Sequence, residues 1–164
     1  MKKLLGIVVL GLLLSANAYA AKFSAKVGDI VENEVSFGKR DKFPLPPGKF
    51  TVAVIKKSKE FRDVYLVQID EDTGVLRWSI KIMATGSTQW ESWNPGKMCK
   101  RTNVYFIKKK LANKKFACWM VNHSRSDIAA NKGFWKEVRD YEIANDIKTP
   151  DIFVYSKHDY AKGS

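Results

Sequence analysis

The chain contains only two cysteines and two histidines among its 164 residues. A structural zinc site takes four cysteine or histidine ligands at characteristic spacings, whereas His123 and His158 lie far apart in the sequence. Cys99 and Cys118 are much farther apart than the cysteines of a redox-active C-x-x-C motif. We therefore predict that the protein uses neither a metal ion nor thiol chemistry, and we expect no cofactor.

The motifs of phosphate-binding and hydrolytic enzymes are also missing. The chain has no G-x-x-x-x-G-K-S/T or G-x-G-x-x-G loop to cradle a phosphate, and no G-x-S-x-G nucleophile elbow. The acidic residues 70–72 lack the ligand spacing of a calcium-binding EF-hand loop. We interpret them as a solvated turn.

His123 is the one candidate for a catalytic role. It is predicted to follow a strand and precede a helix, a position where catalytic residues often lie, and Ser124, Ser126 and Asp127 are its neighbours in sequence. Adjacent residues do not make a hydrolase triad, because nucleophile, base and orienting group must converge in space. In the competing interpretation His123 hydrogen-bonds its loop, and Ser124 or Ser126 caps the helix.

Long apolar runs are confined to the first residues of the chain. Leu4–Leu14 is uncharged, but it is far shorter than the ~20 residues that span a bilayer. It follows Lys2 and Lys3 and precedes small residues in the A-x-A pattern, which is the layout of a secretory signal peptide. We predict cleavage between Ala20 and Ala21 and export to the periplasm or exterior of a bacterial cell, because the short signal and the excess of lysine over arginine suit a bacterium.

Composition and length predict one globular domain after the signal peptide. Regular alternation of apolar residues begins only at residue 49, and three prolines before it disfavour regular strand pairing there. The predicted organisation is a signal peptide at 1–20, an N-terminal extended segment at 21–48, a single α+β domain at 49–158 and a polar tail at 159–164.

Alternation with a period of two predicts an antiparallel sheet of about five to six strands. One main helix at 134–146 is expected to pack on a face of that single sheet. Two sets of apolar residues are each predicted to share a face: Phe50, Val52 and Val54, and Leu76, Trp78, Ile80 and Ile82. The order is β-β-β-loop-β-β-α-β, with strands at 49–57, 63–70, 75–82, 102–108, 115–123 and 151–157 and a loop at 84–98.

Two cysteines in an exported chain are most simply a disulfide. A Cys99–Cys118 bond closes a loop of about 20 residues and is expected to stabilise the fold by roughly 3 kcal/mol. A turn centred on residues 112–113 would place Cys118 opposite Ile107. Either the turn lies earlier, within residues 107–110, or the chain before Thr102 bends back so that the bond joins the tryptophan loop to the sheet; we favour the second arrangement.

Acidic residues are absent from residues 92–126, which contain nine of the chain's 29 lysines and arginines. An acid-free basic segment raises the local affinity for anions, and Trp90 and Trp93 are possible stacking residues beside it. The competing interpretation is a lysine-rich hairpin tip that only keeps the chain soluble and protects a sheet edge. The predicted anion-binding residues are Lys97, Lys100, Arg101, Lys108, Lys109, Lys110, Lys114 and Lys115.

Two functions follow from these patterns. The leading one is a non-enzymatic exported domain that binds an anionic surface, glycan or acidic protein through the basic hairpin, with nucleic acid not expected as a partner in that compartment. The alternative is a small cell-envelope hydrolase with a loop pocket around His123.

Overall fold

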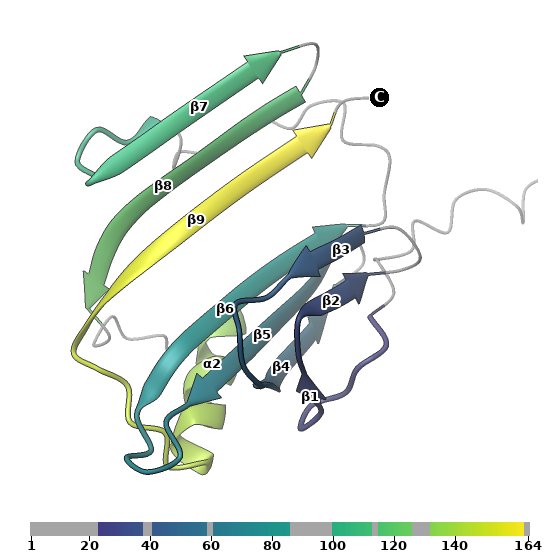
Figure 1. The fold of residues 1–164 in the computed structure, drawn as a ribbon, viewed down its shortest axis with the longest axis vertical. Helices are drawn as coiled ribbons and strands as arrows, with labels where there is room; N and C mark the ends of the chain where they lie inside the picture. Colours follow the sequence, from purple (N-terminus) through teal and green to yellow (C-terminus); the bar gives the residue numbers. More distant parts are fainter. Residues whose placement is uncertain are drawn as a thin grey trace, which may run out of the picture.

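The structure is a computed structural model, and it describes residues 23–37, 41–58, 61–85, 100–112, 115–125 and 132–162. In these ranges the chain forms nine strands and one helix, which make three antiparallel sheets and a single helical layer (Figure 1). The predicted α+β class is confirmed. The single sheet of five to six strands is wrong, because the strands divide among three sheets.

The largest sheet has four strands in the order β1-β4-β5-β6. β4 (Phe50–Lys57), β5 (Phe61–Ile69) and β6 (Leu76–Thr85) form the predicted antiparallel meander, and the short β1 (Ile30–Val31) pairs with β4. The long strands are rich in β-branched and aromatic residues, which favour extended backbone. Gly74, with a φ of +70°, adopts the expected left-handed conformation in the turn between β5 and β6.

A β-bulge in β4 decides which face of this sheet its side chains occupy. The register with β5 shifts between Val52 and Val54. Val52 therefore belongs to one hydrophobic cluster, while Ala53 and Val54 both belong to the cluster on the opposite face. The expectation that Phe50, Val52 and Val54 share a face is wrong, because the extra residue of a bulge changes the phase of the alternation.

A second register shift lies at the start of β6, opposite Gln68 and Ile69 of β5. It puts Leu76 against the helix, whereas Ile80 and Ile82 pack on the other face. Trp78 is 55% exposed. The four residues expected on one face thus divide between two faces and solvent, for the same physical reason as in β4.

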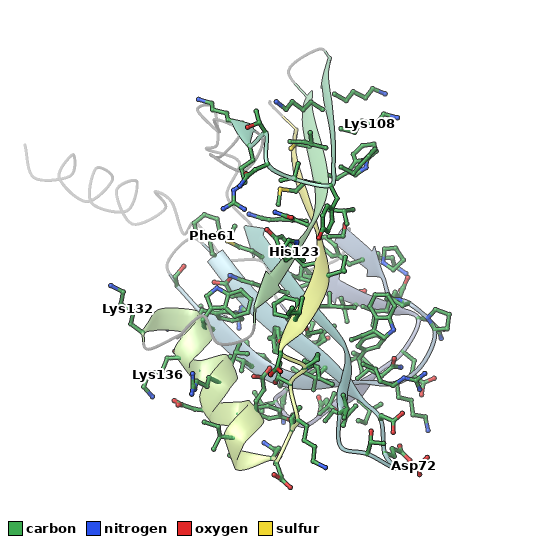
Figure 2. All side chains as sticks on the ribbon, turned by 90° about the vertical axis from the view of Figure 1, so that its left-hand side faces the viewer. Phe61, Asp72, Lys108, His123, Lys132 and Lys136 are labelled. Atoms are coloured by element: carbon green, nitrogen blue, oxygen red, sulfur yellow. The ribbon has the colours of Figure 1, made fainter. Side chains whose placement is uncertain are left out.

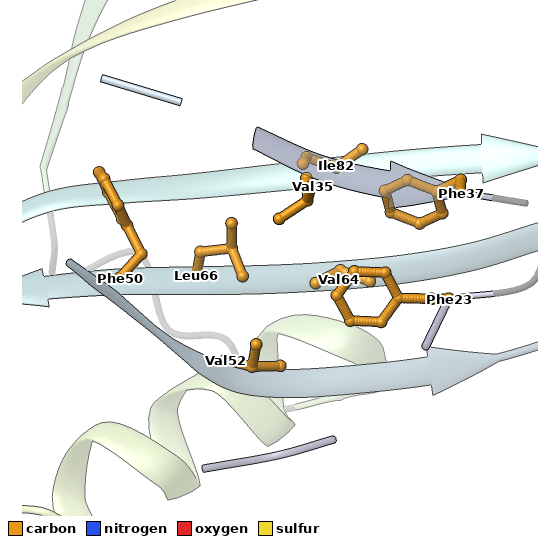
Figure 3. Packing of buried hydrophobic residues seen from close by; sticks show 8 residues of the cluster. All are labelled: Phe23, Val35, Phe37, Phe50, Val52, Val64, Leu66 and Ile82. Carbon is orange, nitrogen blue, oxygen red and sulfur yellow. The ribbon is translucent and has the colours of Figure 1, made fainter. Parts of the chain in front are cut away.

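A two-stranded hairpin covers one face of the four-stranded sheet (Figures 1 and 3). It consists of β2 (Glu34–Phe37) and β3 (Asp41–Pro44), and Pro44 pairs with Glu34 at the end of the ladder, where a missing N–H is tolerated. The segment 21–48 therefore contributes to the core, which the sequence did not indicate. The cluster between hairpin and sheet contains Phe23, Val35, Phe37, Phe50, Val52, Val64, Leu66 and Ile82.

Helix α2 (Gly133–Ala144) covers the other face of the same sheet (Figure 1). Phe134 and Val138 are its buried residues and pack against β4 and β5. The helix ends in a Schellman motif: Asp146, at a φ of +50°, donates to the carbonyl of residue 143, and the N–H of Ile147 donates to Glu142. Within the described ranges, no helix is long and apolar enough to cross a membrane.

The third sheet has the order β7-β8-β9 and lies beside the four-stranded sheet, away from helix α2 (Figure 1). It consists of β7 (Phe106–Ala112), β8 (Lys115–Arg125) and β9 (Ile152–Lys162). β7 begins four residues later than predicted, and β8 and β9 extend beyond their predicted ends. No ladder between the described strands joins β9 to β6, which is why the predicted single sheet does not form.

Candidate functional site

The described part of the chain contains six of the predicted anion-binding or disulfide residues with their side chains: Lys100, Arg101, Lys108, Lys109, Lys110 and Cys118. For Lys115 only the backbone is described. The predicted residues Trp90, Trp93, Lys97, Cys99 and Lys114, and the cleavage site Ala20–Ala21, lie outside the described residues. The site is therefore built from the β7–β8–β9 sheet and the segment 100–105 before it.

The hairpin of β7 and β8 has a different register from the predicted one. Ala112 pairs with Lys115, and Cys118 pairs with Lys109 instead of Ile107. The turn therefore lies one residue later in the chain than expected. In this register, as in the predicted one, Cys118 does not face Cys99 across the hairpin.

The three consecutive lysines of β7 are exposed. Because successive side chains of a strand point to opposite faces, Lys109 lies on one face of the sheet and Lys108 and Lys110 on the other. The three lysines therefore do not all point to the same side of the sheet. The Lys108 ammonium lies 5.3 Å from the centre of the Trp119 ring, a cation–π contact that orients the charge above an aromatic surface. Figure 2 shows Lys108 at the end of the molecule farthest from Lys132 and Lys136 of the helix region.

One face of the three-stranded sheet is covered by the segment 100–105. Arg101 donates from Nη1 to the Tyr155 hydroxyl at 3.3 Å, and Asn122 donates from Nδ2 to the carbonyl of residue 103 at 3.4 Å. Cys118 and Met120 lie on this side and are 0% and 1% exposed. We call it the covered face. The burial of Cys118 suits a structural role, and no described cysteine is a free thiol. The Cys99–Cys118 pairing stays a prediction, because Cys99 lies outside the described residues.

The opposite side, which we call the open face, carries apolar residues that remain accessible. Phe106 is 45%, Ile152 61% and Val154 69% exposed. Register places them on one side, because paired residues of antiparallel strands share a face: Phe106 pairs with Val121, and Val154 with His123. The described side chains of the open face are Phe106, Lys108, Lys110, Trp119, Val121, His123, Ile152, Val154 and Ser156.

The apolar residues of the open face were not predicted from the sequence. Ile152, Phe153 and Val154 are consecutive, as are the apolar residues from Phe116 to Val121. A strand that is apolar at consecutive positions has apolar residues on both faces, which is typical of strands buried on both sides. That signal was present in β8 and β9, but the covering of one face and the exposure of the other are tertiary features.

His123 lies within β8 and does not follow it, so its predicted place between a strand and a helix is wrong. Its imidazole is exposed and stacks on the Tyr105 ring, with the centroids 5.2 Å apart. Ser124 is also part of β8, and the N-cap of α2 is not Ser124 but Lys132, without a side-chain bond. Ser126 and Asp127 lie outside the described residues.

Two shifted pKa values belong to a polar contact between the helix and the four-stranded sheet. Burial raises the pKa of the Tyr65 phenol, and it also raises the pKa of the Glu142 carboxyl. Tyr65 donates to Glu142 Oε1 at 3.3 Å, and Thr149 donates to Oε2 at 3.5 Å. These bonds favour the charged carboxylate but do not outweigh the burial. The contact links α2 to β5.

The acidic residues 70–72 form the turn between β5 and β6. Asp70 Oδ1 accepts hydrogen bonds from the N–H and the hydroxyl of Thr73 at 3.1 and 2.8 Å, and these bonds lower the pKa of the Asp70 carboxyl. The carboxylate thus closes the turn as an Asx motif. Among the described residues, no group of three or more histidine, cysteine, aspartate or glutamate side chains is placed to hold a metal ion.

Comparisons with protein-family models, curated proteins and solved structures find no match to this chain.

Proposed function

We propose that the protein is an exported, non-enzymatic domain that binds an anionic partner or surface through the β7–β8 hairpin and the segment before it. The observation that carries the proposal is the cluster of exposed cations on and beside an edge strand: Lys108, Lys109 and Lys110 are consecutive in β7, and Lys100 and Arg101 precede it. The strands β7, β8 and β9 together contain seven basic residues and one acidic residue. This excess raises the local affinity for anions and the rate of association.

The spacing of these charges supports binding to an extended partner. Strand residues rise about 3.3 Å each, so Lys108 and Lys110, which share a face of β7, lie within the ~8 Å Debye length of physiological salt and act together. Lysine provides a compact charge without the planar fork of arginine. The expected interaction is salt-sensitive and is not specific for a single carboxylate.

Export and the disulfide are part of the same proposal. The signal-like N-terminus supports export, and the complete burial of Cys118 supports a structural bond with Cys99 instead of a reactive thiol. In that compartment the anionic partners are membrane surfaces, glycans and acidic proteins. The hydrolase alternative has less support, because the described contact of the His123 ring is aromatic stacking on Tyr105.

The test is elution from a sulfated-glycan column over a salt gradient. The hairpin variant carries Lys108→Gln, Lys109→Gln and Lys110→Gln. We expect it to elute at clearly lower salt than the wild type, because three neighbouring charges are lost from one site.

A matched control removes three exposed lysines elsewhere, with Lys26→Gln, Lys49→Gln and Lys132→Gln. Both variants have the same net charge, so only the position of the charge differs. We expect the control to elute close to the wild type. Equal shifts for the two variants, with both folded by circular dichroism, would show that retention follows net charge alone and would contradict the proposal.

A further inference from the structure

The open face carries accessible apolar residues at positions where a solvent-facing sheet surface normally has polar ones. Antiparallel sheets with one solvated face normally alternate apolar and polar residues. Here the open face keeps Phe106, Ile152 and Val154 largely accessible, with Val121 half-buried beside Phe106 and Trp119 half-buried beside Lys108. Exposed apolar residues gathered on one side of a sheet, instead of scattered singly, mark an interaction site.

The charges on the open face limit the kinds of partner that it can bind. On the open face, Lys108 and Lys110 follow Phe106 along β7 in the direction of the hairpin turn. The described side chains of this face include no acidic residue. The one acidic residue of the three strands, Asp159, pairs with Cys118, in the register of the covered face. A second copy of the chain would bring two lysine-rich sheets together, and like charges in one interface repel. The complementary partner is therefore both apolar and anionic.

Aromatic and aliphatic residues beside lysines are the combination found at membrane interfaces. Aromatic rings with a polar edge settle at the level of the lipid headgroups, and Tyr105, 68% exposed, lies beside His123 at the margin of the open face. Ile152 and Val154 are suited to the acyl boundary, since they gain from leaving water and have nothing to offer a sugar hydroxyl. Lysines near an anionic bilayer add about fivefold in affinity each.

We propose that the open face docks on the surface of an anionic phospholipid bilayer, with Phe106, Ile152 and Val154 at the headgroup–acyl boundary and Lys108 and Lys110 on the lipid phosphates. The inference rests on the proposed anion binding and names the surface that is bound. The protein lies on the bilayer through one face of a sheet, and the four-stranded sheet with its helix stays in water.

The test is cosedimentation of the full mature chain with vesicles of phosphatidylglycerol and phosphatidylcholine, compared with pure phosphatidylcholine. The variant Ile152→Thr/Val154→Thr keeps β-branched residues in the strand and adds hydroxyls to the open face. Its control, Ile30→Thr/Val27→Thr, changes the same residue types at similarly exposed positions, 56% and 55%. We expect the wild type to bind only the anionic vesicles, the open-face variant to bind them about tenfold more weakly, and the control to bind like the wild type.

The column experiment separates this inference from the proposed function. The open-face variant is expected to elute from the sulfated-glycan column at the salt of the wild type, because its charges are unchanged. If it also binds anionic vesicles like the wild type, or if the wild type is retained on the column but does not sediment with vesicles, membrane docking is overturned and anion binding stands. A dimer that the open-face variant dissociates would also overturn docking, by assigning the open face to a second copy. A wild type that is neither retained on the column nor sedimented with anionic vesicles would refute both.

Discussion

Glu142 is a residue whose charged form the fold disfavours, because burial raises the pKa of its carboxyl. It lies on the buried side of α2, where burial raises its pKa against the hydrogen bonds from Tyr65 and Thr149 and the nearby positive charge of Arg139. A carboxyl whose pKa is raised by folding stabilises the native state in its neutral form and loses that contribution as the pH rises through the folded pKa. At neutral pH the charged Glu142 carboxylate therefore lowers the free energy of unfolding.

We predict that Glu142→Gln stabilises the protein more at pH 7 than at pH 4. Below the ordinary carboxyl pKa of 4.5 both side chains are neutral, and the glutamine oxygen still accepts the Tyr65 hydrogen bond. At pH 7 only the wild-type protein carries a charge at this half-buried position. Urea denaturation of both proteins at the two pH values measures the difference.

Tyr65→Phe is the companion variant. It removes a hydrogen bond that favours the charged carboxylate, so the folded pKa of Glu142 should rise further and the loss of stability should extend to a higher pH than in the wild type. An equal effect of Glu142→Gln at pH 4 and pH 7 would contradict this account of the carboxyl.

Among the secondary-structure elements, the hairpin β2–β3 contributes to the hydrophobic core in a way that the sequence did not predict. Phe37 is 1% exposed and stacks on Phe23, with the ring centroids 5.0 Å apart. Its edge also meets Phe43 at 5.5 Å. Two short strands with no ladder to the main sheet are held on it by the hydrophobic cluster that Val35 and Phe37 share with residues of β4, β5 and β6, so the hairpin is a structural layer instead of a wrapping segment.

We predict that Phe37→Ala destabilises the fold by about 3–5 kcal/mol, the usual cost of emptying a buried phenylalanine site. Phe43→Ala is the matched control in the same hairpin, and because Phe43 is 37% exposed it should cost clearly less. Chemical denaturation gives both values. Similar losses at the two positions would mean that Phe37 is not the residue that anchors the hairpin.

The whole molecule has a three-layer body, with hairpin, four-stranded sheet and helix, and a second sheet of three strands beside it (Figure 1). No described ladder joins the two large sheets. The covered face holds the fully buried Cys118. A covalent link there would stabilise the sheet that carries the basic hairpin.

We predict that Cys99→Ser lowers the free energy of unfolding by roughly 3 kcal/mol, the loop-closure contribution of a bond spanning about 20 residues. The non-reducing intact mass of the exported wild type should match a chain that begins at Ala21 and lacks two hydrogens. Two titratable thiols in the denatured exported protein, or a retained Met1, would refute the disulfide or the export respectively.

The sequence alone was sufficient for the features that depend on local patterns. Alternation of apolar residues identified the β4–β5–β6 meander, helical spacing identified α2, and Gly74 identified a turn, because each needs only neighbours along the chain. The clustering of lysines was also visible in the sequence. Its placement beside an apolar surface was not.

The tertiary structure alone decided the division into three sheets, the faces of β4 and β6, and the open face. Val54 and Leu76 changed sides because a bulge inserts one residue into a ladder, and nothing in the alternation of a single strand records where its partner skips a residue. Likewise β9 is apolar on both sides in sequence, and only the packing of the segment 100–105 determines that one face is covered while Ile152 and Val154 remain exposed. Hydrogen-bond partners and covering layers come from distant parts of the chain, so they follow from the complete fold and not from any local pattern.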